Sequence, residues 1–290
     1  MSEAGDVPGA SILGKASRWA GGAVLVASVG FIGHRFWHLE WSSLQDHVSW
    51  PFAIGLAGAC ASFAAADHAL ARAWIATSDP IALVPRLGLV RAYARGVLTK
   101  YLPGSIFQYV SRHVGGRQVG LAHGQLVRST VTEVGLHVVA SLTVAALCLL
   151  ANRMPFIAGA GAAILIAGGM VTLRPLLTAL ALQIAAFGLF ALAAVLVGGA
   201  VLPSGTELGQ FAALFMLAWL AGFVIPVAPG GLGVREAAFL ALAGNEMPAT
   251  SLLAAVLALR VASLAGDLTY GLGIMAVTRS KTTELPFRTA

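Results

Sequence analysis

The sequence predicts an all-α membrane protein with seven or eight transmembrane helices and two re-entrant or broken segments. Hydrophobic residues make up 58% of the 290 residues and charged residues only 10%, whereas soluble domains carry about a quarter charged residues. No polar stretch reaches the roughly 50 residues of a small soluble domain. We therefore expect a single transmembrane domain over 1–290, and a soluble enzyme is excluded.

The expected spans follow from the length of the apolar stretches. A helix needs about 20 apolar residues to cross the hydrocarbon. Seven stretches of this kind occur, at 17–37, 50–73, 123–150, 155–173, 176–202, 207–227 and 249–276. They are preceded by a polar tail at 1–18.

Two segments do not fit a simple span. Residues 84–116 carry several cations around Pro103 and Gly104, and residues 228–246 contain Pro229, Gly230 and Gly231 before a short apolar stretch. Proline and glycine interrupt helices, and irregular backbone is tolerated in a membrane only where protein or a cavity surrounds it. Both segments are therefore predicted to be re-entrant or broken helices.

The positive charges predict the orientation. Lys15 and Arg18 precede the first span and Glu40 and Asp46 follow it, which places the N-terminus in the cytoplasm. Seven crossings would leave the tail at 279–290 outside, although it is basic, so an eighth crossing through one broken segment is the alternative. We expect a cell (inner) membrane protein with both termini cytoplasmic.

The two Pro-Gly pairs recur 126 residues apart, which suggests a weak internal repeat. Four expected spans separate them, and this number would leave both pairs on the same face of the membrane. An inverted repeat needs an odd number. The type of symmetry is left open.

The first motif, KYLPGSIFQYVSR, begins at Lys100. Its Pro-Gly pair ends one helix and starts another, whose free N–H groups attract anions. Lys100, Ser105 and Arg112 are candidate ligands for a lipid head group. The alternative is an interfacial turn with cations that reach toward the membrane surface.

The second motif, PVAPGGLGVREAA, begins at Pro226 and contains Arg235 and Glu236. Arg235 is a second candidate head-group ligand. Glu236 falls in the first turn of the following helix, where a carboxylate is favoured. It is either a cap for that helix or a binding or coupling group, because ionisable residues at membrane depth are often functional.

Charged residues also occur within the expected spans. Arg128 and Arg260 are further candidate head-group ligands, and Glu133, His137 and Asp267 are candidates for coupling or for a polar cavity. Glu133 and His137 are one helical turn apart and could relay protons, or Glu133 could pair with an arginine of a broken segment. Because burial of a lone charge is costly, we expect Arg112, Glu133, Arg235, Glu236, Arg260 and Asp267 to converge on one hydrated cavity. Asp67 and His68 are instead interpreted as hydrated, or paired with Arg72.

The two motifs together resemble the membrane (flippase) region of the lysylphosphatidylglycerol synthase/flippase family and its stand-alone relatives. This resemblance covers most of the chain and implies translocation of a lipid. Two-part relatives also have a soluble aminoacyl-transferring domain, which this sequence lacks, so no synthase activity is implied.

The leading functional hypothesis is movement of a polar or phosphate-containing lipid across the bilayer, either downhill or coupled to protons. The expected partner is a membrane phospholipid or a polyprenyl-phosphate-linked lipid, with no nucleic acid, cofactor or metal, and a homo-oligomer is left open. The alternative is an integral-membrane transferase or accessory subunit in lipid or polyprenyl-linked glycan synthesis, with Glu133 or Asp267 as a base.

Overall fold

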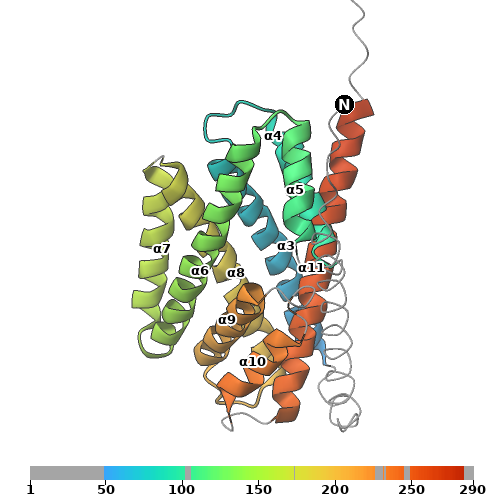
Figure 1. Cartoon of the computed structure of the whole chain (residues 1–290). Coiled ribbons are helices and arrows are strands. Elements are labelled where there is room, and N and C mark those ends of the chain that lie inside the picture. Colours follow the sequence, from blue (N-terminus) through green and yellow to red (C-terminus); the bar gives the residue numbers. More distant parts are fainter. Residues whose placement is uncertain are drawn as a thin grey trace, which may run out of the picture.

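The computed structural model describes residues 49–101, 106–172, 174–225, 231, 233–244 and 249–283. Within these ranges it contains nine helices and no strand, which confirms the all-α fold class (Figure 1). The helices are α3 (Trp50–Ser78), α4 (Arg86–Thr99), α5 (Phe107–Gln118), α6 (His123–Arg153), α7 (Pro155–Val171), α8 (Pro175–Val201), α9 (Leu208–Val224), α10 (Val234–Ala243) and α11 (Ala249–Thr283).

Four of these helices are long and apolar enough to cross a membrane. They are α3, α6, α8 and the part of α11 from Thr250 to Thr278, each with 27 to 31 residues. Helices α7 and α9 are apolar too, but each has only 17 residues. The expected spans at 50–73, 123–150, 176–202 and 249–276 therefore each correspond to a long helix, and the first, at 17–37, lies outside the described residues.

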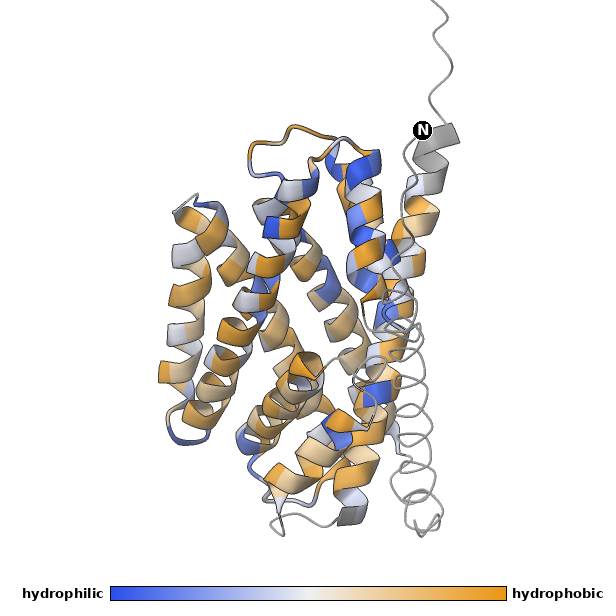
Figure 2. Ribbon diagram, viewed as in Figure 1, coloured by the Kyte–Doolittle hydropathy of each residue, from blue (hydrophilic) through white to orange (hydrophobic). Residues whose placement is uncertain are grey.

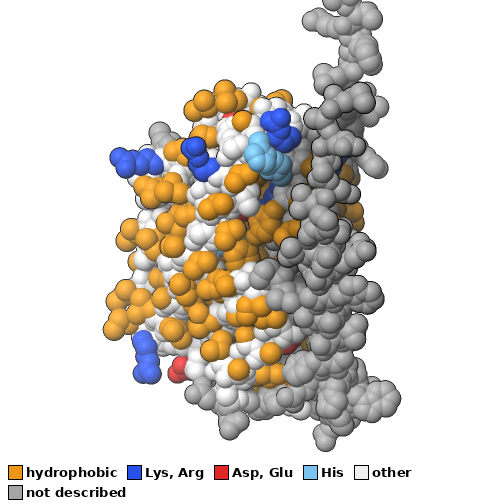
Figure 3. Space-filling model, viewed as in Figure 1, with side chains coloured by type: hydrophobic (Ala, Val, Ile, Leu, Met, Phe, Trp, Pro, Cys, Tyr) orange, Lys and Arg blue, Asp and Glu red, His pale blue; other side chains and the backbone are white. Residues whose placement is uncertain are grey.

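The outer surface also suits a membrane. Hydrophobic residues dominate most of the ribbons, and hydrophilic residues gather on α4 and α5 and at a few points of the other helices (Figure 2). On the face shown in Figure 3, apolar side chains form a broad band, and most charged side chains lie near its two ends. Phe156 is 91% exposed on this apolar exterior. Such an exterior is compatible with insertion into a bilayer.

Helices α4 and α5 form a hairpin in which the two backbones approach closely. A Cβ added at Gly115 on α5 would lie 2.5 Å from the Cβ of Ala92 on α4, and one at Gly96 on α4 would lie 2.7 Å from the Cγ of Arg112 on α5. Ala92, earlier on α4, meets the later residue Gly115 of α5, and Gly96, later on α4, meets the earlier residue Arg112. The two helices are therefore antiparallel. The first interrupted segment is thus a tight helical hairpin.

Helices α9 and α10 form a second hairpin. Phe211, near the start of α9, contacts Phe239 on α10, with ring centroids 5.4 Å apart, and Gly222, near the end of α9, contacts Arg235 at the start of α10. The stretch predicted as a span at 207–227 corresponds to α9, which ends at Val224 and packs against α10.

The two hairpins lie at opposite ends of the bundle, α4–α5 at the top and α9–α10 at the bottom of Figure 1. Between the hairpins the chain passes through α6, α7 and α8. The fourth span expected between the two Pro-Gly pairs, at 207–227, corresponds to α9 of the second hairpin. Helices α3 and α8 pack antiparallel in the centre, where the Phe63 and Phe190 rings are 4.9 Å apart.

The end of the chain also differs from the expected boundary. Helix α11 continues to Thr283, so the tail predicted at 279–290 begins as helix. Its C-terminal end lies at the same end of the bundle as the α4–α5 hairpin (Figure 1). The other predicted tail, at 1–18, lies outside the described residues.

Candidate functional site

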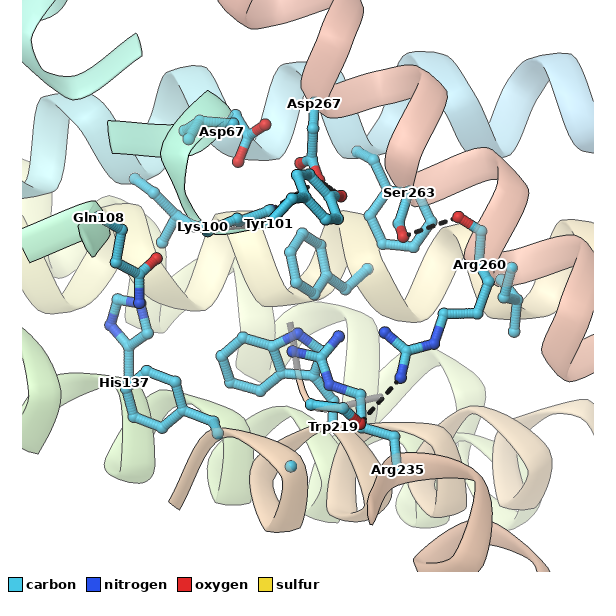
Figure 4. A pocket seen from close by; sticks show the side chains of 18 of the residues that line it. Asp67, Lys100, Tyr101, Gln108, His137, Trp219, Arg235, Arg260, Ser263 and Asp267 are labelled. Atoms are coloured by element: carbon cyan, nitrogen blue, oxygen red, sulfur yellow. Dashed lines mark hydrogen bonds and ion pairs between the residues drawn. The ribbon is translucent and has the colours of Figure 1, made fainter. Parts of the chain in front are cut away.

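A cavity of about 150 Å³ lies where the two hairpins meet the long helices (Figure 4). Its walls include the inner ends of all four hairpin helices, together with parts of α3, α6, α8 and α11. The six charged residues that were expected to converge all line it: Arg112, Glu133, Arg235, Glu236, Arg260 and Asp267. The fold thus gathers charges from four helices into one place.

Arg112 on α5 forms the most completely buried ion pair of the cavity. Its Nη1 donates to both carboxylate oxygens of Glu133 on α6, at 2.7 and 2.9 Å. The guanidinium also lies 3.8 Å from the ring centre of Tyr93, a cation–π distance. Arg112 and Glu133 are 6% and 3% exposed. Glu133 therefore pairs with an arginine that follows a broken segment, which was the structural alternative to a proton relay.

Glu236 on α10 has two roles at once. Its Oε2 accepts a hydrogen bond from the backbone N–H of Gly233 at 2.7 Å, which caps the helix. Its Oε1 accepts a hydrogen bond from Nε of Arg260 at 2.5 Å. Arg260 also donates from Nη2 to the carbonyl of Gly231 at 3.0 Å. Gly231 and Gly233 have φ values of +69° and +80°, which favour glycine. Arg260 thereby joins α11 to the start of α10.

Asp267 on α11 is bound by the end of α4. Lys100 Nζ lies 2.7 Å from Oδ2 of Asp267, and the Tyr101 hydroxyl donates to the same oxygen. Asp267 is buried. Asp267 and Arg260, both expected to converge on one cavity, line it, and each has a partner on a different hairpin.

Arg235 differs from the other two arginines of the cavity. Among the described residues no carboxylate lies within ion-pair distance of it. Its Nε, like that of Arg112, is buried without a hydrogen-bond partner. Its guanidinium lies 5.2 Å from the ring centre of Trp219, and Figure 4 shows the two side by side. A guanidinium stays protonated at neutral pH, so this side of the cavity holds a cation that has no ion-pair partner among the described residues.

Aromatic rings make the apolar wall beside Arg235. Trp219 and Phe223 stack at 5.2 Å, and Phe223 stacks in turn on His137 at 5.1 Å. Nδ1 of His137 is 3.0 Å from Oε1 of Gln183. His137 therefore belongs to the aromatic wall, and its hydrogen bond goes to α8 rather than to Glu133.

Not every predicted residue reaches the cavity. Arg128 lies exposed on α6 and is absent from the cavity wall, because its position on the helix turns it outward. Gly231 lines the cavity. The remaining candidates lie outside the described residues: Pro103, Gly104, Ser105, Pro229 and Gly230.

Several residues of the cavity were not singled out from the sequence. The interpretation of Asp67 as hydrated or paired with Arg72 is wrong, because Asp67 is only 3% exposed and lines the cavity, while Arg72 is exposed. A carboxylate within an apolar span was the available signal. Tyr93, Tyr101 and Trp219 carry no comparable signal, since aromatic residues are common in membrane helices.

Within the described part of the chain, no group of three His, Cys, Asp or Glu side chains could hold a metal ion. Comparison with models of known protein families, with curated proteins and with solved structures finds no match to this chain. The chemistry of the cavity is therefore inferred from the residues that line it. One side is basic and aromatic, with Arg235 and Trp219, and the other side is rich in carboxylates, with Asp67 and Asp267.

Proposed function

We propose that this chain is a membrane carrier that moves a polar or phosphate-containing lipid from one leaflet to the other. The observation that carries the proposal is the Arg235 guanidinium, which lines the cavity without a carboxylate partner among the described residues. A phosphate would supply the missing negative charge. Charge-assisted hydrogen bonds from a guanidinium to phosphate are among the strongest in proteins.

The energetic need for such a site is large. An isolated ion in hydrocarbon costs tens of kcal/mol by Born solvation. A head group that contacts Arg235 on the basic side of the cavity would keep a countercharge, and the apolar chains would remain in the bilayer. The aromatic wall of Trp219 and Phe223 suits the part of the lipid next to the head group, because it is apolar and partly buried.

The arrangement of the helices supports a carrier as well. We infer that α4–α5 and α9–α10 are re-entrant hairpins that enter the membrane from opposite sides, within a protein of seven or eight spans. The units α3–α6 and α8–α11 each place a hairpin between two long helices and run in opposite directions (Figure 1). Opposed repeats of this kind are common in secondary transporters, with the binding site near the midplane.

The resemblance of the two Pro-Gly motifs to the flippase region of the lysylphosphatidylglycerol synthase/flippase family agrees with this proposal. We place the protein in the cell membrane with the α4–α5 end of the bundle cytoplasmic, because the basic segment from Arg72 to Arg117 and the end of α11 lie there. The transferase alternative has less support, since both carboxylates proposed as its base, Glu133 and Asp267, are held in ion pairs.

The test is lipid movement in reconstituted vesicles. Purified protein in vesicles that contain a fluorescent phosphatidylglycerol should expose inner-leaflet probe to an impermeant quencher faster than empty vesicles do. Arg235→Ala should abolish the added rate. The matched control, Arg153→Ala, removes an exposed arginine at the far end of α6 and should leave the rate unchanged.

Equal rates for wild type and empty vesicles, measured with phosphatidylglycerol and with a polyprenyl phosphate, would contradict lipid transport. A normal rate in a well-folded Arg235→Ala variant would instead contradict the assignment of Arg235.

A further inference from the structure

The carboxylate-rich side of the cavity contains one carboxyl group more than its cations can balance. Asp67 on α3 is 3% exposed and lines the cavity, and its Oδ2 is buried without a hydrogen-bond partner among the described residues. Asp267 on α11 lines the same cavity. Figure 4 shows both carboxyl groups beside Lys100 and Tyr101.

The hydrogen-bond donors beside the two carboxyl groups, Lys100 and Tyr101, both contact Asp267. Lys100 Nζ lies 2.7 Å from Oδ2 of Asp267, and Tyr101 donates to the same atom. Asp67 Oδ2 receives neither. Two carboxylates that face each other in a buried site repel strongly unless they share a proton. A hydrogen bond between the two carboxyl groups itself requires a proton on one of them.

Among the described residues, Lys100 and Arg112 are the cations close to Asp67, whereas Arg235 lies beside Trp219 on the other side of the cavity. The titratable groups that face it come from four helices: Tyr93 and Lys100 from α4 and its end, Arg112 from α5, Glu133 with His137 from α6, and Asp267 with Tyr270 from α11. Helix α8 faces the cavity with Phe190, which carries no charge. Because Arg112 is paired with Glu133 and Lys100 with Asp267, Asp67 is the remaining negative charge of this side.

We propose that Asp67 and Asp267 form a proton-binding site that couples lipid movement to the proton gradient. In the described state the Asp67 carboxyl keeps its O–H bond and donates it to Asp267. When the cluster opens to water, this O–H bond breaks, the proton passes to a water molecule, and the Asp67 carboxylate is left hydrated. One proton is then released or taken up in each cycle.

The coupling rests on the proposed function, whereas the proton site itself does not. The site can be tested on purified protein by infrared spectroscopy, which detects the C=O stretch of a protonated carboxyl group. Wild type near neutral pH should show such a band, Asp67→Asn should lose it, and Asp67→Glu should restore it at a shifted frequency. Glu207→Gln, which removes an exposed carboxylate at the start of α9, should leave the band unchanged.

The coupling is tested in vesicles with a gradient of one pH unit and the membrane potential clamped. Transfer of one proton per lipid should shift the steady-state ratio of the fluorescent lipid between leaflets by about tenfold. In Asp67→Asn the shift should disappear.

The outcomes separate the two proposals. A band that persists in Asp67→Asn, or is absent from wild type, would overturn the proton site. Lipid movement that ignores the pH gradient in wild type would overturn the coupling. A band that behaves as expected in a protein without lipid movement would uphold the proton site and contradict only the carrier function.

Discussion

The two hairpins use an arginine at the same place in opposite ways. Each has one on its second helix, facing the cavity: Arg112 on α5 and Arg235 on α10. Arg112 is bound through Nη1 by both oxygens of Glu133 and lies on the Tyr93 ring. Arg235 has the Trp219 ring but no carboxylate among the described residues.

This difference separates a structural arginine from one that is free to bind a ligand. In the second hairpin the carboxylate next to the arginine, Glu236, is already engaged by Arg260 and by the helix N-terminus. The arginine of the α4–α5 hairpin is thus held in an ion pair with Glu133, which we call the closed pair. The arginine of the α9–α10 hairpin, Arg235, has no carboxylate partner among the described residues, and we call it the open cation.

The largest effect on stability is expected from breaking the closed pair. Glu133→Ala leaves the buried Arg112 without its partner, and removal of one member of a buried pair costs about 3 to 5 kcal/mol. Arg112→Ala should cost a similar amount. We expect both variants to unfold at markedly lower temperature in detergent, whereas Arg235→Ala should unfold close to the wild-type temperature.

A hydrated ion pair would tolerate the loss of one partner better, but Glu133 is only 3% exposed. Equal unfolding temperatures for Glu133→Ala and Arg235→Ala would show that the two arginines do not differ as described.

A second, smaller loss of stability is expected from a methyl group inside the α4–α5 hairpin. The Cβ of Gly115→Ala would lie 2.5 Å from the Cβ of Ala92 and 3.2 Å from its Cα. Such overpacking costs about 1 to 3 kcal/mol. In Gly135→Ala the new methyl group meets nothing within 4 Å, so this control should gain stability from helix propensity, by about 0.5 to 1 kcal/mol. Chemical or thermal unfolding that ranks the pair in the reverse order would contradict the close packing.

The corresponding change in the α9–α10 hairpin should affect function more than stability. An added Cβ at Gly222 would clash with Cγ of Arg235, but that flexible side chain can move aside, at a cost of about 1 kcal/mol. Gly222→Ala should therefore displace the open cation and slow lipid movement severalfold. Gly188→Ala, with nothing within 4 Å, is the control, and equal lipid movement by both variants would argue against the position of Arg235.

The smallest effect concerns a histidine pair at the outer end of the first hairpin. His113 Nε2 and His123 Nδ1 are 3.0 Å apart. Partial burial and the nearby His123 and Arg117 lower the pKa of His113 below its ordinary 6.5. The folded protein thus disfavours the charged form, so a slight loss of stability should set in as the pH falls below about 6.5. An NMR titration should show a higher pKa for His113 in His123→Gln; an unchanged value would exclude His123 as a cause.

Much of the cavity could be predicted from the sequence, because an ionisable side chain in an apolar helix is costly to expose to lipid and therefore faces the protein interior. Arg260 and Asp267 had to face inward, and they do. Their partners could not be predicted: Asp267 is held by Tyr101, 166 positions away, and no local pattern encodes such a contact. The packing of α9 against α10 could not be predicted either, because an arm of a hairpin and a short span have the same composition. Asp67 was missed because its exposure depends on where α4 and α11 pack.

The sequence distances of the ion pairs also set an order of assembly during synthesis. Arg112 and Glu133 are 21 positions apart, and Glu236 and Arg260 are 24 apart, so each pair can close soon after its second member leaves the ribosome. At about 5 to 20 residues per second, the contact between Tyr101 and Asp267 must wait roughly 10 to 30 s after Tyr101 is made. During that interval the end of α4 stays without its partner, and the nascent chain carries a half-built cavity open toward the place that α11 later fills.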